Sequence, residues 1–103
     1  MLLKHCVFLN FKSDVSDDEK EAIMEGLASL VDVVDGVLDM SFGSNLDFEN
    51  KTPEFDYGFV VTFRDRNAHL AYEMHKTHVE MGGRLVDACV GDYEGITVFD
   101  LEV

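Results

Sequence analysis

The strongest constraint on the fold is a first strand that is apolar on both of its faces. Residues 3–12 alternate with the period of a β-strand, with Val7 and Leu9 on one face and Phe8 on the other. A strand with large apolar groups on two sides belongs to a sheet that is covered on two sides. The sequence therefore requires a cover for each face of the sheet.

The clearest helix signal follows at residues 16–34. Ser16 and Glu19 match a capping box, in which the first side chain caps the helix and the second reaches back to it. Gly36 follows the segment, and glycine readily adopts the left-handed conformation that ends helices. An apolar stripe at helical spacing lies between these signals and comprises Ile23, Leu27, Leu30, Val31 and Val34. A helix is expected over this range.

Three more strands and a second helical region complete the predicted order. The strands are expected at residues 37–45, 55–63 and 95–101. The helical region runs from about residue 64 to about residue 88. Glycine costs about 1 kcal/mol inside a helix, so Gly82-Gly83 is expected to bend or interrupt it. On the first of these three strands, one face is expected to carry Leu38, Met40 and Phe42.

The order β-α-β-β-α-β predicts an α+β fold of the ferredoxin-like kind, with a four-stranded antiparallel sheet and its helices on one face. All 103 residues form a single domain in this interpretation. The helices leave the sheet face that carries Phe8 uncovered. A second copy of the chain would cover it, so the expected assembly is a homodimer that packs sheet on sheet.

The charge excludes several classes of partner. The chain has 21 acidic and 8 basic residues and a net charge of −13, so nucleic acids and anionic membrane surfaces would repel it. No apolar run approaches the ~20 residues of a membrane helix, and no signal peptide is expected. Cys6 and Cys89 lie far apart and form no C-x-x-C pair. A cytoplasmic protein with two free thiols is the expectation.

Residues 70–78 carry the most suggestive chemistry. Tyr72, His75 and His78 lie within seven residues, and a phenol and two imidazoles can donate, accept and carry protons near neutral pH. His78 could act as a base while the Tyr72 hydroxyl polarises a carbonyl group. The alternative is a structural core, in which the buried tyrosine bonds a nearby imidazole.

The remaining histidines leave two questions open. His5 shares the strand face of Val7 and is either a hydrogen-bonded core residue or part of a pocket wall. The three-residue spacing of His75 and His78 could place two metal ligands on one helical face. Zinc needs a third or fourth donor, and none stands at motif spacing. No metal site is therefore expected, and His69 and His75 are interpreted as surface or rim residues.

These segments together resemble the stress-responsive A/B barrel (Dabb) family of the dimeric α+β barrel superfamily. Their order and spacing make the match specific over nearly the whole chain. Family members commonly have a proline directly after the first histidine of the Tyr72–His78 segment, where this chain has Lys76. The matching residues are Lys4-His5-x-Val7-x-Leu9-x-Phe11-Lys12, Gly36-Val37, Phe42-Gly43, Tyr57-Gly58, Tyr72-x-x-His75-x-x-His78 and Val98-x-Asp100.

The resemblance implies a homodimer whose sheets form a barrel, with a pocket between sheet and helices. Tyr72 and His78 would be the catalytic pair, as in a plant polyketide cyclase of this family. There, a histidine base promotes an aldol-type ring closure without a metal or organic cofactor. The ligand would be a small apolar or aromatic carbonyl compound. The expected pocket residues are His5, Val7, Leu9, Ile23, Leu27, Phe59 and His75.

Two functions from different classes fit these residues. One is a cofactor-independent enzyme that moves a proton on the carbonyl compound, with cyclase, lyase or isomerase chemistry. The other is a non-catalytic, stress-associated dimer that binds or sequesters small molecules or has a structural role. A solvent-open pocket lined by His5, Tyr72 and His78 favours the enzyme, and a pocket filled by its own side chains favours the alternative. The fold itself does not choose, because one fold hosts many functions.

Overall fold

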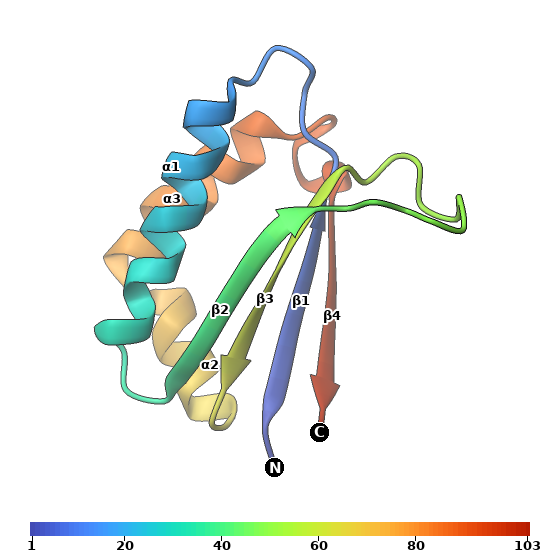
Figure 1. Ribbon diagram of the computed structural model, residues 1–103. Helices are drawn as coiled ribbons and strands as arrows, with labels where there is room; N and C mark the ends of the chain where they lie inside the picture. Colours follow the sequence, from blue (N-terminus) through green and yellow to red (C-terminus); the bar gives the residue numbers. More distant parts are fainter.

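The computed structural model describes residues 1–103 and contains one sheet with helices on one face (Figure 1). The four strands lie in the order β2-β3-β1-β4, and each neighbouring pair is antiparallel. The predicted ferredoxin-like α+β fold is confirmed. The strands are β1 (Leu3–Leu9), β2 (Val37–Ser44), β3 (Tyr57–Phe63) and β4 (Ile96–Glu102). The helices are α1 (Asp17–Ala28), α2 (Arg66–Met74) and α3 (Lys76–Ala88), with 3-10 turns η1 (Ser29–Asp32) and η2 (Asp92–Gly95).

The core lies between the sheet and the helices. Alternate residues of β1 and β3, such as Leu9 and Val61, face inward and have no exposed surface. They share one apolar cluster with Ile23 and Leu27 of α1, which are at most 2% exposed. Burying each such side chain stabilises the fold by about 1.5–3 kcal/mol relative to leaving it in water. None of the helices has the length and apolar character that a membrane span requires.

Helix α1 begins where the sequence predicts it. The Ser16 hydroxyl oxygen accepts a hydrogen bond of 3.1 Å from the Glu19 backbone N–H. The second predicted contact of the capping box, from the Glu19 side chain back to Ser16, is wrong. The Glu19 carboxylate binds Arg84 of α3 instead, at 3.1 Å between Oε2 and Nε. The α-helix also ends earlier than predicted, at Ala28, and η1 continues it. Gly36 then adopts a left-handed conformation, with φ of +88°.

Replacing Ser16 with alanine should lower the free energy of unfolding by about 0.5–2 kcal/mol, because the Glu19 N–H loses its acceptor. Urea melts of the variant and the wild type measure the difference. Ser13→Ala, at an exposed serine just before the helix, is the control and should leave the midpoint unchanged. Equal midpoints for Ser16→Ala and the wild type would show that the cap contributes nothing.

The predicted face of β2 is right for Met40 and Phe42, which pair with the inward-facing Val61 and Phe59, but wrong for Leu38, because β2 contains a bulge. Val37 pairs with Phe63 and Asp39 pairs with Thr62, so Leu38 is an extra residue between them. The bulge changes the alternation of side chains. Val37 is therefore buried on the core face, while Leu38 is 47% exposed.

The second helical region breaks at His75 and not at the glycines. His75 has extended backbone angles, with φ −64° and ψ 137°, and its Nδ1 accepts a hydrogen bond of 3.1 Å from the Thr77 N–H. The ring therefore caps α3, and the break forms although Lys76 replaces the usual proline. Gly82-Gly83 lies inside an uninterrupted α3. The predicted bend is wrong because the rest of this 13-residue helix tolerates the cost of two glycines.

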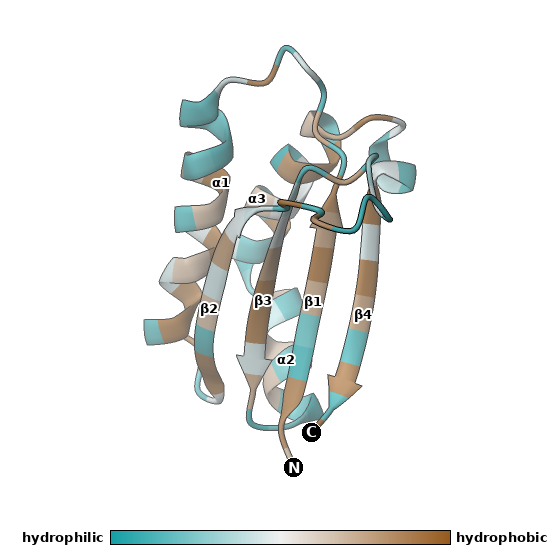
Figure 2. Cartoon of the chain, turned by 45° about the vertical axis from the view of Figure 1, so that its right-hand side comes forward, coloured by the Kyte–Doolittle hydropathy of each residue, from teal (hydrophilic) through white to brown (hydrophobic).

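The other face of the sheet has no helix over it. The strand register places Phe8, Val60, Phe99 and Leu101 on this face. The rings of Phe8 and Phe99 lie 6.1 Å apart, and Phe99 and Leu101 are 56% and 52% exposed. In Figure 2 the strands lie in front of α2 and α3, so this face is turned toward the reader. The chain alone leaves an apolar sheet face open to water, which the pattern of residues 3–12 predicted.

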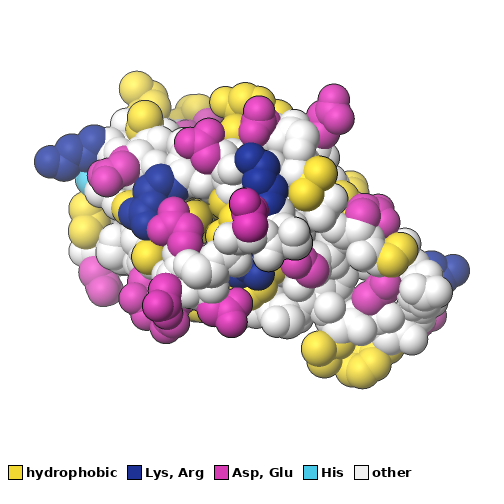
Figure 3. All heavy atoms as spheres, turned by 90° about the horizontal axis from the view of Figure 1, so that it is seen from above, with side chains coloured by type: hydrophobic (Ala, Val, Ile, Leu, Met, Phe, Trp, Pro, Cys, Tyr) yellow, Lys and Arg dark blue, Asp and Glu magenta, His cyan; other side chains and the backbone are white.

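The negative charge is spread over the face of the molecule that is seen from above in Figure 3. Acidic side chains are scattered across the face seen in Figure 3, with lysines and arginines between them. Arg64 binds Asp35 at 2.9 Å, and this hydrogen-bonded pair lowers the pKa of the Asp35 carboxyl. The acidic groups on this face therefore form no single concentrated patch. Cys6 and Cys89 are both free thiols, as expected.

Candidate functional site

A cavity of about 450 Å³ lies between the sheet and helix α3. Its lining is mostly apolar, with a few polar side chains, which is the usual character of small-molecule sites. Glu73 of α2 and Tyr93 of η2 add polar groups to its wall. The strands contribute His5, Val7, Phe59, Ile96 and Val98, and α3 contributes His78, Val79, Gly82, Gly83, Leu85 and Val86.

The two glycines of α3 explain why this space is open. Both line the cavity, and neither projects a side chain into it. A Cβ atom at Gly83 would meet nothing within 4 Å, and one at Gly82 would lie 3.7 Å from the His78 ring. The absence of side chains at these two positions therefore leaves this part of the cavity wall open.

His78 lies on the cavity wall and can act as a base. Its burial lowers the pKa of the imidazole, and the nearby charge and backbone carbonyl of Glu73 offset part of this effect. The ring is therefore unprotonated at neutral pH and can accept a proton. Its other neighbour is Tyr72, whose ring centroid lies 4.6 Å away.

Tyr72 lies behind His78 and does not line the cavity. Its side chain is 1% exposed, and its hydroxyl group is buried without a hydrogen-bond partner. Burial raises the pKa of this phenol far above its ordinary value, so it stays protonated and keeps a proton to donate in a hydrogen bond. An unpaired buried polar group costs about 1–3 kcal/mol, and such groups are rare enough in folded proteins to call for an explanation.

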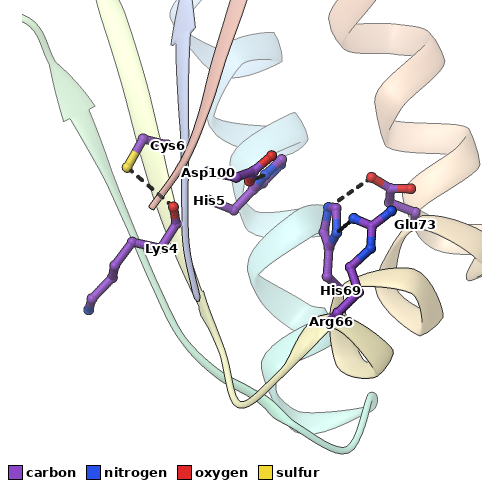
Figure 4. A network of polar contacts seen from close by, with 7 residues as sticks. All are labelled: Lys4, His5, Cys6, Arg66, His69, Glu73 and Asp100. Atoms are coloured by element: carbon purple, nitrogen blue, oxygen red, sulfur yellow. Dashed lines mark hydrogen bonds and ion pairs between the residues drawn. The ribbon is translucent and has the colours of Figure 1, made fainter. Parts of the chain in front are cut away.

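A polar network extends from the cavity to the end of the sheet (Figure 4). His5 Nδ1 lies 2.6 Å from an oxygen of Asp100, and the His5 ring centroid lies 5.0 Å from that of His69. His69 is 4% exposed, and its Nδ1 lies 2.6 Å from a guanidinium nitrogen of Arg66. Its Nε2 lies 2.8 Å from a Glu73 oxygen, but the direction is too poor for a hydrogen bond. Burial lowers the pKa of His69.

The residues predicted for the site divide into three groups. Those on the cavity wall are His5, Val7, Phe59 and His78. Leu9, Ile23 and Leu27 lie in the core, because α1 covers the β2 side of the sheet and the cavity lies toward β4 (Figure 1). Tyr72 adjoins His78 from the core, and His75 lies at the junction of α2 and α3, outside the cavity lining.

The interpretation of His69 as a surface or rim residue is wrong, because its side chain is 4% exposed, and the sequence analysis did not propose Glu73 or Asp100 as site residues. His69 and Glu73 are four residues apart on α2, a spacing that places them on one helical face. Asp100 alternates with Val98 along β4 and so shares its face. Both spacings were visible, but neither indicates that β1, β4 and α2 meet at one point.

The lowered pKa of His78 predicts a change of stability with pH. In the unfolded chain the imidazole titrates near about 6.5, whereas in the folded chain it titrates at a lower pH. Between these two values the unfolded chain binds more protons, so stability falls as the pH drops below about 6.5. Urea melts from about pH 7.5 to 5.5 should show a larger loss for the wild type than for His78→Gln. Parallel pH profiles would contradict the assignment.

Known proteins are similar to this chain over nearly its whole length. Two relatives are HS1 of Arabidopsis thaliana, a stress-response A/B barrel domain-containing protein, and olivetolic acid cyclase of Cannabis sativa. HS1 is 29% identical over 100 residues, covering 93% of this chain and 92% of HS1. The cyclase is 26% identical over 100 residues, covering 97% of this chain and 95% of the cyclase.

A solved structure is also similar along the entire chain. It is a dimeric ferredoxin-like protein of unknown function from Jannaschia sp. CCS1, with a TM-score of 0.95, 38% identity and full coverage of both chains. The family profile of the Stress responsive A/B Barrel Domain matches residues 3–103. The match spans nearly all of the sequence, and the chain therefore belongs to the stress-responsive A/B barrel family.

Proposed function

We propose that the protein is a homodimer whose chains each bind a small apolar or aromatic carbonyl compound, from which His78 removes a proton. The observation that carries this proposal is the position of His78, an imidazole with a lowered pKa on the wall of a mostly apolar cavity of about 450 Å³. A general base must be both unprotonated and within reach of its substrate. His78 meets the first condition, and the cavity offers a route to the second.

The proposed step moves one proton and leaves a stabilised oxyanion. His78 takes a proton from the carbon next to the carbonyl group, the electrons of that C–H bond form a carbon–carbon double bond, and the π electrons of the carbonyl group move onto its oxygen. Because Tyr72 lies behind His78 and outside the cavity lining, its unpaired hydroxyl reaches this oxygen only after the His78 ring shifts, and it then donates a hydrogen bond as the charge develops. The resulting enolate can attack a second carbonyl group and close a ring, or it can be reprotonated elsewhere. The likeness to olivetolic acid cyclase supports this class of chemistry.

The dimer is supported by the open sheet face and by a relative. Phe8 and Phe99 present an apolar surface that no helix of the chain covers. The Jannaschia protein, 38% identical, is described as dimeric. A permanent, apolar interface between two such sheets would bury more than about 2,000 Å² in total.

Exchange of α-protons on a simple ketone tests the chemistry without knowledge of the natural substrate. Acetophenone in D2O should lose its methyl protons faster with the protein than with buffer alone, and one-dimensional NMR follows this loss. Tyr72→Phe should slow the exchange but not stop it, since the base remains. Binding of acetophenone without faster exchange would overturn the enzyme proposal and favour a dimer that only binds or sequesters small molecules.

Filling the cavity should separate ligand binding from folding. Gly83→Leu places a side chain where a Cβ meets no neighbour, so it should abolish acetophenone binding measured by saturation-transfer NMR. Stability should be maintained or rise, because glycine is about 0.8–1.0 kcal/mol less favourable than alanine inside a helix and leucine is close to alanine. Ala71→Leu, at an exposed position of α2, is the control and should bind as the wild type does. Unchanged binding by Gly83→Leu would place the ligand elsewhere.

A further inference from the structure

The polar network at the end of the sheet contains a set of side chains that the sequence spacing hides. His5 of β1, His69 of α2 and Asp100 of β4 are far apart in the chain, yet one potential ligand atom of each lies within 4.8 Å of the other two. We propose that these three residues bind a divalent transition-metal ion, with zinc as the best match, at the wall of the cavity. This departs from the expectation that the chain has no metal site.

The donor atoms suit such an ion. Zinc is bound by imidazole nitrogens at about 2.0–2.1 Å and by carboxylate oxygens at about 2.0–2.2 Å, which places tetrahedral ligand atoms about 3.4 Å apart. His5 and Asp100 are already 2.6 Å apart. Zinc binding would lengthen this separation by about 0.8 Å and shorten the longest one, at most 4.8 Å, by up to about 1.4 Å; the Asp100 side chain, 49% exposed, has room to move.

His69 provides a second observation that points to a ligand. It is 4% exposed, and its buried Nε2 atom has a Glu73 oxygen 2.8 Å away but makes no well-directed hydrogen bond with it. A buried, unsatisfied ring nitrogen is costly for the fold, and coordination to a metal ion would remove that cost. The rings of His5 and His69 already face a common space, with centroids 5.0 Å apart.

Arg66 competes with the proposed ion. Its guanidinium group donates to His69 Nδ1 at 2.6 Å, which fixes the proton of the neutral ring on Nε2. Binding through Nε2 therefore requires Arg66 to release the ring, and its positive charge also repels a cation. Arg66 is exposed, so its side chain is free to turn toward solvent. Removing Arg66 should consequently strengthen metal binding more than removing Arg64, which lies outside the cluster, whereas nonspecific surface binding predicts similar effects for the two arginines.

The proposed ion would lie beside the cavity, where it could contact a bound ligand. Three protein ligands leave the fourth position of a tetrahedral zinc open, as in catalytic zinc sites. His5 lines the cavity, so this position would be accessible to a bound ligand, whose carbonyl oxygen the ion would polarise. The inference does not depend on proton transfer by His78, because its test measures metal binding alone.

Titration of the full metal-free protein with Zn²⁺ by calorimetry, and with Co²⁺ by visible absorption, tests the site. The wild type should bind one ion per chain. Loss of a group that only orients a ligand weakens metal affinity about 10–100-fold, so His69→Gln and Asp100→Asn should each weaken it by at least ~10-fold. Arg66→Ala should strengthen binding. His75→Asn and Arg64→Ala, outside the three-residue cluster, should bind as the wild type does.

Two results would overturn the proposal. One is the absence of saturable binding by the wild type at micromolar Zn²⁺. The other is equal affinity in the wild type, His69→Gln and Asp100→Asn, which would assign the binding to scattered surface carboxylates. Asp100→Asn alters a half-exposed side chain, so it keeps the test decisive even if the buried His69→Gln variant fails to fold.

Discussion

His78→Gln should reduce the protein-catalysed exchange of acetophenone α-protons about 100- to 10,000-fold, which is the usual contribution of a positioned general base. The glutamine side chain is similar in size and can form hydrogen bonds, but it cannot accept a proton near neutral pH. NMR measurement of the exchange rate in D2O, with buffer-catalysed exchange subtracted, gives the ratio. The effect should be much larger than that of Tyr72→Phe, since the tyrosine stabilises the oxyanion and does not hold the proton.

The neighbouring histidine of the same segment provides the control for this experiment. His75 lies outside the cavity lining and caps α3 through its Nδ1. His75→Asn keeps a side chain that can cap the helix, so it should retain the wild-type exchange rate. If His78→Gln and the wild type exchange protons equally fast, His78 is not the base. Their thermal melts at neutral pH show whether any loss comes from unfolding.

Phe8→Asp should dissociate the dimer or prevent folding. The substitution places a carboxylate in the centre of the open sheet face, where the ring of Phe8 lies beside that of Phe99. A buried charge without a partner is strongly unfavourable, and two-fold symmetry would bring two such charges to one interface. Sedimentation equilibrium should change from a dimer to an 11.6 kDa monomer, or the variant should lack a cooperative melt.

A second position on the face separates dissociation from misfolding. Phe99 is 56% exposed in the single chain, so Phe99→Asp should cost the isolated chain little and still disrupt the interface. Val33→Asp, at a residue that is 60% exposed at the end of η1, makes the same kind of change away from the sheet and should remain dimeric. Dimers of wild-type stability for both phenylalanine variants would refute the sheet-on-sheet assembly.

The parts of the fold that were predictable are those that local patterns specify. Alternation along residues 3–12 and 55–63, and the stripe from Ile23 to Val34, each depend on one element and its burial. Ser16 caps α1 because a cap requires only a side chain and the backbone three residues ahead. The predicted contact from the Glu19 side chain back to Ser16 was wrong because it depended on a distant residue. Arg84, 65 residues away in the chain, binds the Glu19 carboxylate instead.

The site was predictable only in part, for the same reason. The segment containing Tyr72 and His78 is visible in the sequence, and the two rings do meet. The set of His5, His69 and Asp100 depends instead on the meeting of three elements, and no spacing rule within one element can reveal it. The two glycines were interpreted through their effect on the backbone, whereas the structure places both on the cavity wall, where they project no side chain.

The glycine pair in α3 has an evolutionary consequence. Each glycine leaves the helix about 1 kcal/mol less stable than alanine would, and Gly83 has room for a larger residue. Most random replacements at this position would therefore be retained by a chain selected for stability alone, and they would fill the cavity. Among related sequences, lineages that still use the cavity should keep small residues at positions 82 and 83, and lineages that have lost its use should accumulate larger ones there.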